Sequence, residues 1–441
     1  MADAAGVGED QTRPRRERLS RELAEAMAQI EEAGGQALGS QLEATALLRD
    51  ALRERASDIH LDPREDGVLV RMRVDGVVLD TLLLSRPQAQ PLVNQLKTLS
   101  RLDPLPAMVP HEGRATLDLE GQSIDLRVTV APCVQGDKLA LRLLQPERVE
   151  YRLSELGLRG PDLEEIRVWL DNTRGLFLVA GPTGGGKTTT LYSLLQNLKL
   201  QERNIITIED PVEYEVAGVN QIQVDRERGP QLDEGLRAML RLDPDYLLLG
   251  EIRDAAAARA AVDAAASGRA LMSTVHSPDA AGVITVLRNF GLSDQEISAH
   301  LAVVVAQRLV RKLCPQCRVK GQPSASAQRW LRSMGVEPAG TVWREQGCEA
   351  CGGIGYHGRT GIFEVWHLND DDYAAILQHA DERSLRDRLA QRGHMFLLDD
   401  GLAKAREGVT TIDELRLMGG FGQPRQLADV ATVGERSADA G

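Results

Sequence analysis

The stretch Leu176-Phe-Leu-Val-Ala-Gly-Pro-Thr-Gly-Gly-Gly-Lys-Thr188 decides the fold of this chain. An apolar run typical of a buried strand leads into a glycine-rich loop, and the segment Thr189–Leu198 that follows is predicted to be a helix. In this Walker A pattern, glycines let backbone N–H groups curl around a phosphate at the positive end of a helix dipole. Lys187 is predicted to reach the β- and γ-phosphates, and the Thr188 hydroxyl to bind Mg²⁺. The residues predicted to hold nucleotide here are Gly181, Pro182, Thr183, Gly184, Gly185, Gly186, Lys187, Thr188 and Thr189.

Three further apolar runs end in polar residues: Ile205–Ile208 before Glu209 and Asp210, Tyr246–Leu249 before Gly250 and Glu251, and Leu271–Val275 before His276. In a doubly wound sheet such strand ends form the edge that faces the ligand. The second run is a Walker B strand in which Gly250 replaces the usual Asp, so Glu251 is the candidate for positioning or deprotonating the attacking water. Glu209 is predicted to be a second catalytic carboxylate, and Asp210 to join the nucleotide site. His276 is predicted to sense the γ-phosphate.

Four of the five cysteines form two close pairs, Cys314-Pro-Gln-Cys317 and Cys348-Glu-Ala-Cys351. In a reducing compartment this spacing indicates a metal before a disulfide. Two pairs supply four thiolates to one tetrahedral Zn²⁺ and leave no position for water, which predicts a structural zinc site. A zinc ribbon can also bind DNA, but the residues between the pairs are not notably basic. Cys133 stands alone and is predicted to be a core residue.

The composition excludes several classes of protein. The chain has 441 residues and a formal net charge of −13, which argues against a surface built to coat nucleic acid. Its hydrophobic content of 42% excludes wholesale disorder. No apolar run is long enough for a transmembrane helix and no signal peptide is visible, so a cytoplasmic location is expected.

The alternation of apolar strand-like runs with amphipathic helical segments predicts an α/β protein, with a P-loop NTPase (RecA-like) core sheet covered by helices on both faces. A smaller α+β domain, with a hairpin turn at Asp75-Gly76 and a helix at Leu92–Ser100, is expected before this core. A zinc module and a helical region are expected after it. The predicted segments are a flexible arm at 1–42 that includes a short helix at Ser20–Glu32, an α+β domain at 43–147, the ATPase core at 148–313, a tetracysteine module at 314–360, a helical subdomain at 361–420 and a disordered tail at 421–441.

As a set, these motifs resemble the ATPases of type II secretion and type IV pilus assembly. Besides the Walker A stretch, the resemblance rests on the Asp box Ile206-Thr-Ile-Glu-Asp-Pro-Val-Glu-Tyr214, the Walker B region Leu240–Asp254 and the His box Ser273-Thr-Val-His-Ser-Pro-Asp-Ala280. Ala56-Ser-Asp-Ile-His-Leu61 and Ile124-Asp-Leu-Arg-Val128 match the domain that precedes the ATPase core in this family. The chain departs from the family at Ser277-Pro278, at Arg269 and at Gly185, which leave the catalytic groups in place.

The resemblance implies a homo-hexameric ring that uses ATP, Mg²⁺ and Zn²⁺ to drive assembly of a pilus-like filament. It implies that the smaller domain supplies arginines to a nucleotide in its own or a neighbouring subunit, and Arg114 and Arg127 are the first candidates, with Arg71 and Arg142 behind them. The implied partners are platform and anchor proteins of the inner membrane, with which the chain would associate peripherally. The type II secretion branch is favoured over pilus extension. A nucleic-acid translocase, which would need basic or aromatic-lined loops, and a non-hydrolysing nucleotide-binding regulator are the remaining alternatives.

Overall fold

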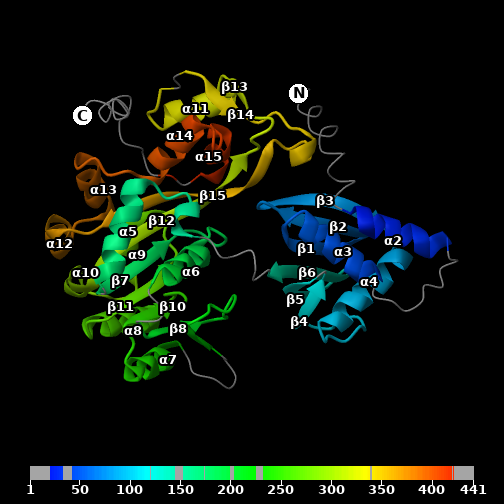
Figure 1. Ribbon diagram of the computed structural model, residues 1–441, viewed down its shortest axis with the longest axis horizontal. Coiled ribbons are helices and arrows are strands. Elements are labelled where there is room, and N and C mark those ends of the chain that lie inside the picture. Colours follow the sequence, from blue (N-terminus) through cyan, green and yellow to red (C-terminus); the bar gives the residue numbers. More distant parts are fainter. Residues whose placement is uncertain are drawn as a thin grey trace. The chain divides into compact units, whose positions relative to one another are not determined.

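The computed structural model describes residues 20–32, 42–119, 121–144, 152–172, 174–198, 203–224, 232–337, 340–419 and 421 (Figure 1). Its contacts divide the chain into two compact units. The first comprises Met1–Glu150, Cys314–Cys317 and Glu345–Gly358, and the second comprises Tyr151–Leu313, Arg318–Arg344 and Arg359–Gly441. Across the described ranges, no helix combines the length and the apolar character that a membrane span requires.

The first unit is built on a six-stranded sheet in the order β3-β2-β1-β6-β5-β4, with antiparallel neighbours throughout. Alternating apolar residues of the strands form one buried face, on which helices α3 and α4 contribute to the same core. Asp75 and Gly76 both have positive φ and close the β2–β3 hairpin at the predicted turn. The elements are α3 (Leu42–Arg53), β1 (Ala56–Arg64), β2 (Gly67–Val74), β3 (Val77–Leu84), α4 (Arg86–Leu99), β4 (His111–Leu119), β5 (Gln122–Cys133) and β6 (Gly136–Leu144).

Helix α2 (Arg21–Glu32) corresponds to the short helix predicted in the N-terminal arm, but it is packed rather than exposed. Leu23 is 0% exposed and joins the core of the first unit with Met27. The Asp50 carboxylate of α3 accepts hydrogen bonds from the backbone N–H groups of Glu22 and Leu23 and so fixes the start of α2. These residues therefore do not form a flexible arm. The predictions for 1–19, 33–41 and 422–441 lie outside the described residues.

The second unit is built on a seven-stranded sheet in the order β15-β12-β7-β11-β10-β8-β9. The pairings from β12 across to β9 are parallel, as the alternation of strands and helices predicts. Its strands are β7 (Gly175–Ala180), β8 (Ile205–Glu209), β9 (Asn220–Gln223), β10 (Tyr246–Leu249), β11 (Ala270–Val275), β12 (Leu301–Leu313) and β15 (Tyr356–His367). The short strands β13 (Val319–Gly321) and β14 (Val342–Arg344) pair separately.

Alternate residues of the buried strands feed two separate cores, one on each face of this sheet. Leu178 and Leu247 pack with the helices that follow β10 and β11, whereas Phe177 and Leu248 pack with α5 and α6. Helices on both faces confirm the predicted α/β class. The helices of this unit are α5 (Gly160–Asn172), α6 (Lys187–Asn197), α7 (Leu232–Met239), α8 (Ala255–Ala266), α9 (Ala280–Asn289), α10 (Asp294–His300), α11 (Ala325–Ser333), α12 (Asp370–Leu377), α13 (Glu382–Gln391), α14 (Leu397–Glu407) and α15 (Ile412–Met418).

The C-terminal third is organised differently from the expected succession of segments. Strand β15 begins in the expected cysteine module and adds an edge to the main sheet, so residues that follow the module belong to the ATPase unit. The two cysteine-bearing segments, Cys314–Cys317 and Glu345–Gly358, cluster with the first unit, where the Gly358 N–H donates to the Asp75 carboxylate at 3.0 Å. Pairing between strands far apart in sequence, rather than local composition, sets these divisions.

Candidate functional site

The glycine-rich loop lies between the end of β7 at Ala180 and the start of α6 at Lys187. Gly186 has a φ of 82° and precedes the first residue of the helix, a conformation that a side chain disfavours. A Cβ on Gly181 would lie 2.5 Å from the backbone oxygen of Gln307 on β12. The loop is thus shaped by its own left-handed residues and by the close approach of a neighbouring strand, and the N–H groups at the start of α6 remain for a ligand.

The side chain of Lys187 folds back over its own loop. Its ammonium donates to the carbonyl oxygens of Gly181 at 2.9 Å and of Pro182 at 3.1 Å. Burial lowers the pKa of Lys187, and the nearby Glu251 carboxylate opposes that shift. Two neutral carbonyls are weaker partners for an ammonium than phosphate oxygens, so this arrangement suits a lysine that exchanges them for a bound nucleotide.

The predicted strand ends meet at one edge of the sheet and carry a cluster of charged side chains. Glu251 follows β10, and one of its carboxylate oxygens lies 2.5 Å from Nε2 of His276, which follows β11. Its other oxygen accepts a hydrogen bond from Nε of Arg253 at 2.6 Å. Arg253 also lies 3.9 Å from the Asp210 carboxylate, at the end of β8. The structure therefore brings Glu251, His276 and Asp210 together, and the field of Glu251 reaches Lys187.

Glu209 lies apart from this cluster. It is 3% exposed, and its carboxylate accepts hydrogen bonds from the hydroxyl of Tyr192 on α6, from Oγ1 of Thr207 at 2.6 Å and from Nε2 of Gln221 at 3.3 Å. Burial raises the pKa of Glu209, although these donors favour its charged form. These hydrogen bonds connect α6, β8 and β9 through the Glu209 carboxylate, and the catalytic role of Glu209 stays a prediction.

Three of the four candidate arginines form a row on the sheet of the first unit. Arg114 of β4 is in register with Arg127 of β5, and Arg127 is in register with Arg142 of β6. Arg142 lies 3.4 Å from the Asp58 carboxylate, and Arg71 forms an ion pair with Asp62. Directly opposed arginines repel one another, so the row is suited to an anion that neutralises it.

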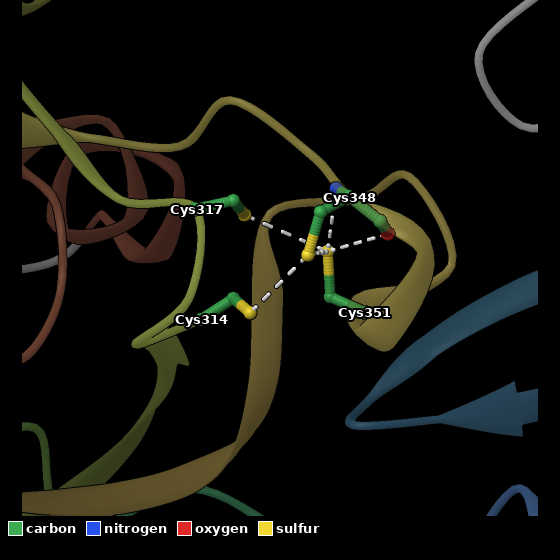
Figure 2. A group of neighbouring side chains, drawn as sticks. All are labelled: Cys314, Cys317, Cys348 and Cys351. Carbon is green, nitrogen blue, oxygen red and sulfur yellow. Dashed lines mark hydrogen bonds between the residues drawn. The ribbon is translucent and has the colours of Figure 1, made fainter.

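The four paired cysteines converge as their spacing predicts (Figure 2). All four Sγ atoms lie within 4.8 Å of one another, with separations of 3.9 Å between Cys314 and Cys348 and 3.8 Å between Cys317 and Cys351. A zinc ion with Zn–S bonds of about 2.3 Å places its tetrahedral thiolates about 3.8 Å apart, so the donor set fits this metal. Burial raises the pKa of the Cys351 thiol, but N–H groups of Cys348 and Gly355 outweigh it and bring that pKa to about 7. Cys133 lies outside the group and is exposed, so the prediction that it is a core residue is wrong: it lies at the end of β5, next to the β5–β6 turn.

Two polar residues of the site were not predicted from the sequence. Arg253 could have been predicted, because it is a positively charged residue two positions after Glu251 and follows the end of a buried strand. Gln307 of β12 donates from Nε2 to the Gly185 carbonyl at 2.7 Å. A polar residue that directly follows the apolar run Leu301–Ala306 was the only hint of that contact, because its partner lies 122 positions away.

A Walker A loop at the carboxyl edge of a parallel sheet covered on both faces, with an acidic cluster beside its lysine, defines a P-loop NTPase. The model of the family described as "Type II/IV secretion system protein" matches residues 32–417, and the chain belongs to that family. It is an ATPase of the secretion and pilus-assembly class.

Three known proteins illustrate the relationship. Type II secretion system protein E of Aeromonas hydrophila is 39% identical over 370 residues, which cover 84% of this chain and 74% of that protein. Type IV pilus assembly ATPase PilB of Thermus thermophilus is 36% identical over 370 residues, 84% of this chain and 42% of that protein. The solved structure of the Legionella pneumophila ATPase DotB shares the fold, with a TM-score of 0.61 at 19% identity over 85% of this chain and 94% of that one.

Proposed function

We propose that this chain is the ATPase that drives assembly of a pseudopilus for type II protein secretion. The observation that carries the proposal is the Glu251 carboxylate, held by His276 and Arg253 next to the lysine of a complete Walker A loop. A carboxylate placed in this way equips the site to hydrolyse a nucleotide and not merely to hold it. The similarity to type II secretion proteins along most of their length favours this branch of the family.

In the proposed reaction each residue has a distinct task. Bound MgATP supplies a polarised γ-phosphoryl group and its leaving group. Lys187 would exchange its loop carbonyls for the β- and γ-phosphates, and the Thr188 hydroxyl and Asp210 would hold Mg²⁺, which would neutralise part of the phosphate charge. Glu251 orients the attacking water and takes its proton, while His276 and Arg253 hold the carboxylate in place. Loss of the γ-phosphate changes the charge that faces His276, which is how this residue would report hydrolysis.

The proposal includes a homo-hexamer in which one subunit completes the site of another. The row of Arg114, Arg127 and Arg142 supports this part, because adjacent guanidinium groups on one face of a sheet repel one another and would favour a bound anion such as the phosphates of a nucleotide. Subunits of a ring meet through heterologous contacts, which allow such a row to serve a neighbour.

This arrangement predicts that two inactive variants restore each other. Lys187→Ala subunits lack a working loop but keep their arginines, whereas subunits with Arg114→Ala and Arg127→Ala have the opposite defect. We expect mixed rings to recover activity at roughly a quarter of their sites, since an arginine-deficient subunit must meet a Lys187→Ala neighbour on the correct side. The measurement is phosphate release after co-assembly. Mixtures no more active than the separate variants would mean that the arginines act within their own subunit.

The four clustered cysteines and the membrane partners complete the proposed function. Cys314, Cys317, Cys348 and Cys351 would hold one structural Zn²⁺. The chain would act on the cytoplasmic side of the inner membrane, bound peripherally through platform and anchor proteins of the secretion apparatus, and would not bind nucleic acid. The similarity to PilB supports a second candidate, the extension of a type IV pilus, although only 42% of that protein is matched.

The function is tested by the ATPase rate per subunit as a function of protein concentration, with and without single-stranded DNA. We expect the rate per subunit to rise with protein concentration, because the active sites would be completed when the ring assembles. Single-stranded DNA should not change this rate. Strong stimulation by DNA would instead identify a nucleic-acid translocase. A rate that is independent of concentration while the chain passes from monomer to ring would contradict completion of the site between subunits.

A further inference from the structure

Strand β12 lies directly against the Walker A loop. It pairs in parallel with β7, and Ala306 is in register with Ala180, the last residue before the loop. The next residue, Gln307, therefore reaches the level of the loop itself. It is 1% exposed, and its backbone oxygen blocks the space where Gly181 would carry a Cβ.

Both the nitrogen and the oxygen of the Gln307 carboxamide form hydrogen bonds at this position. Nε2 donates to the Gly185 carbonyl at 2.7 Å, and Oε1 accepts from the Thr190 hydroxyl of α6 at 2.7 Å. A carbonyl oxygen can only accept, so the nitrogen of the amide must face Gly185 and its oxygen must face Thr190. Among the common side chains of this length, only glutamine offers a donor to one partner and an acceptor to the other.

These two bonds fix a peptide plane of the phosphate-binding loop. In a trans peptide, the carbonyl of one residue and the N–H of the next point in opposite directions. A hydrogen bond that holds the Gly185 carbonyl against β12 therefore turns the Gly186 N–H away from β12. A Cβ on Gly186 would lie only 3.2 Å from Nε2 of Gln307, which shows how closely the amide is packed beneath this plane.

We propose that Gln307 is a positioning residue of the ATPase site, which aims the Gly186 N–H at the phosphates of bound nucleotide by holding the Gly185 carbonyl. Thr190 in turn keeps the amide of Gln307 in its orientation. The strand next to β7 thereby pre-organises the loop before nucleotide arrives, so that binding does not have to supply the free energy of ordering it.

The first test replaces Gln307 by methionine, which has a similar length and cannot donate. The buried Gly185 carbonyl then loses its donor and the peptide plane is free to turn, so we expect the affinity for a fluorescent ADP analogue to fall roughly 5- to 150-fold. Gln307→Glu should lose at least as much, because a carboxylate oxygen would face the Gly185 carbonyl. Wild-type affinity and turnover in a folded Gln307→Met protein would overturn the proposal.

A second test does not depend on the folding of Gln307 variants. Thr190→Val removes the hydroxyl that orients the amide, and Thr190→Ser keeps it, so nucleotide affinity should fall in the first variant and be retained in the second. Thr410→Val is the matched control, since Thr410 is also buried and its hydroxyl also donates to β12, but to the Arg311 carbonyl. It is expected to lower the melting temperature without changing nucleotide affinity. Equal losses of affinity in Thr190→Val and Thr410→Val would show a general packing effect and contradict a positioning role.

Discussion

Replacement of Glu251 by glutamine is expected to lower ATP turnover by about 10²- to 10⁴-fold while nucleotide binding is kept. Glutamine has nearly the size of glutamate and still forms hydrogen bonds, but it cannot take a proton from water. It also removes the charge that His276 and Arg253 face in the structure. Turnover is measured by steady-state phosphate release, and binding by titration with a fluorescent ATP analogue.

Two further variants make this result specific. Glu215→Gln removes a charge from an exposed glutamate outside the site and should leave both quantities unchanged. Glu209→Gln alters the buried carboxylate that Tyr192, Thr207 and Gln221 enclose, and its effect on turnover should be smaller than that of Glu251→Gln. Near-normal turnover in Glu251→Gln, or a larger loss of turnover in Glu209→Gln, would contradict the assignment of Glu251 as the general base.

Removal of zinc is expected to unfold the two cysteine-bearing segments while the second unit still binds nucleotide. Structural zinc contributes roughly 10–16 kcal/mol of apparent binding free energy in small zinc-binding peptides, and three of these four cysteines are buried with few other apolar neighbours. Metal analysis should find about one zinc per chain. After chelation, hydrogen exchange should accelerate in residues 314–317 and 345–358.

The chain offers a matched pair of variants for this prediction. Cys348→Ser removes one of the four clustered sulfurs and should abolish stoichiometric zinc, because serine is a poor ligand for this metal. Cys133→Ser changes an exposed cysteine outside the cluster and should leave the zinc content at one per chain. The tetracysteine site would be contradicted if the wild-type chain, purified in the presence of zinc, contained no zinc. It would also be contradicted if Cys348→Ser and Cys133→Ser lost zinc equally.

Elements bounded by a sharp change in polarity could be predicted from the sequence almost to the residue. Strand β10 was predicted at Tyr246–Leu249, where the structure has it, because an apolar run between Asp245 and Gly250 has few alternatives. Helix α4 was predicted from Leu92 but begins at Arg86. Its prolines obscured the start, although Ser85 and Gln88 form a capping box there and Pro87 occupies the first turn, where a proline is tolerated.

The position and the ligand of the phosphate-binding loop could be predicted from the sequence alone. Its binding groups come from consecutive residues, from Gly181 to Thr188, although β12 also helps to shape their backbone. The cysteine pairs could be predicted for a similar reason, since two short spacings already place the thiolates of each pair together. Such motifs carry their geometry within a few residues.

The tertiary structure alone decided which polar groups act together. Glu209 and Glu251 are equivalent in sequence, as acidic residues at strand ends, yet one turns to Tyr192 and the other to His276. Gln307 meets Gly185 only because β12 pairs with β7. The direction of a side chain at a strand end, and the neighbour it meets, depend on packing between segments that are remote in sequence, and local patterns hold no information about that packing.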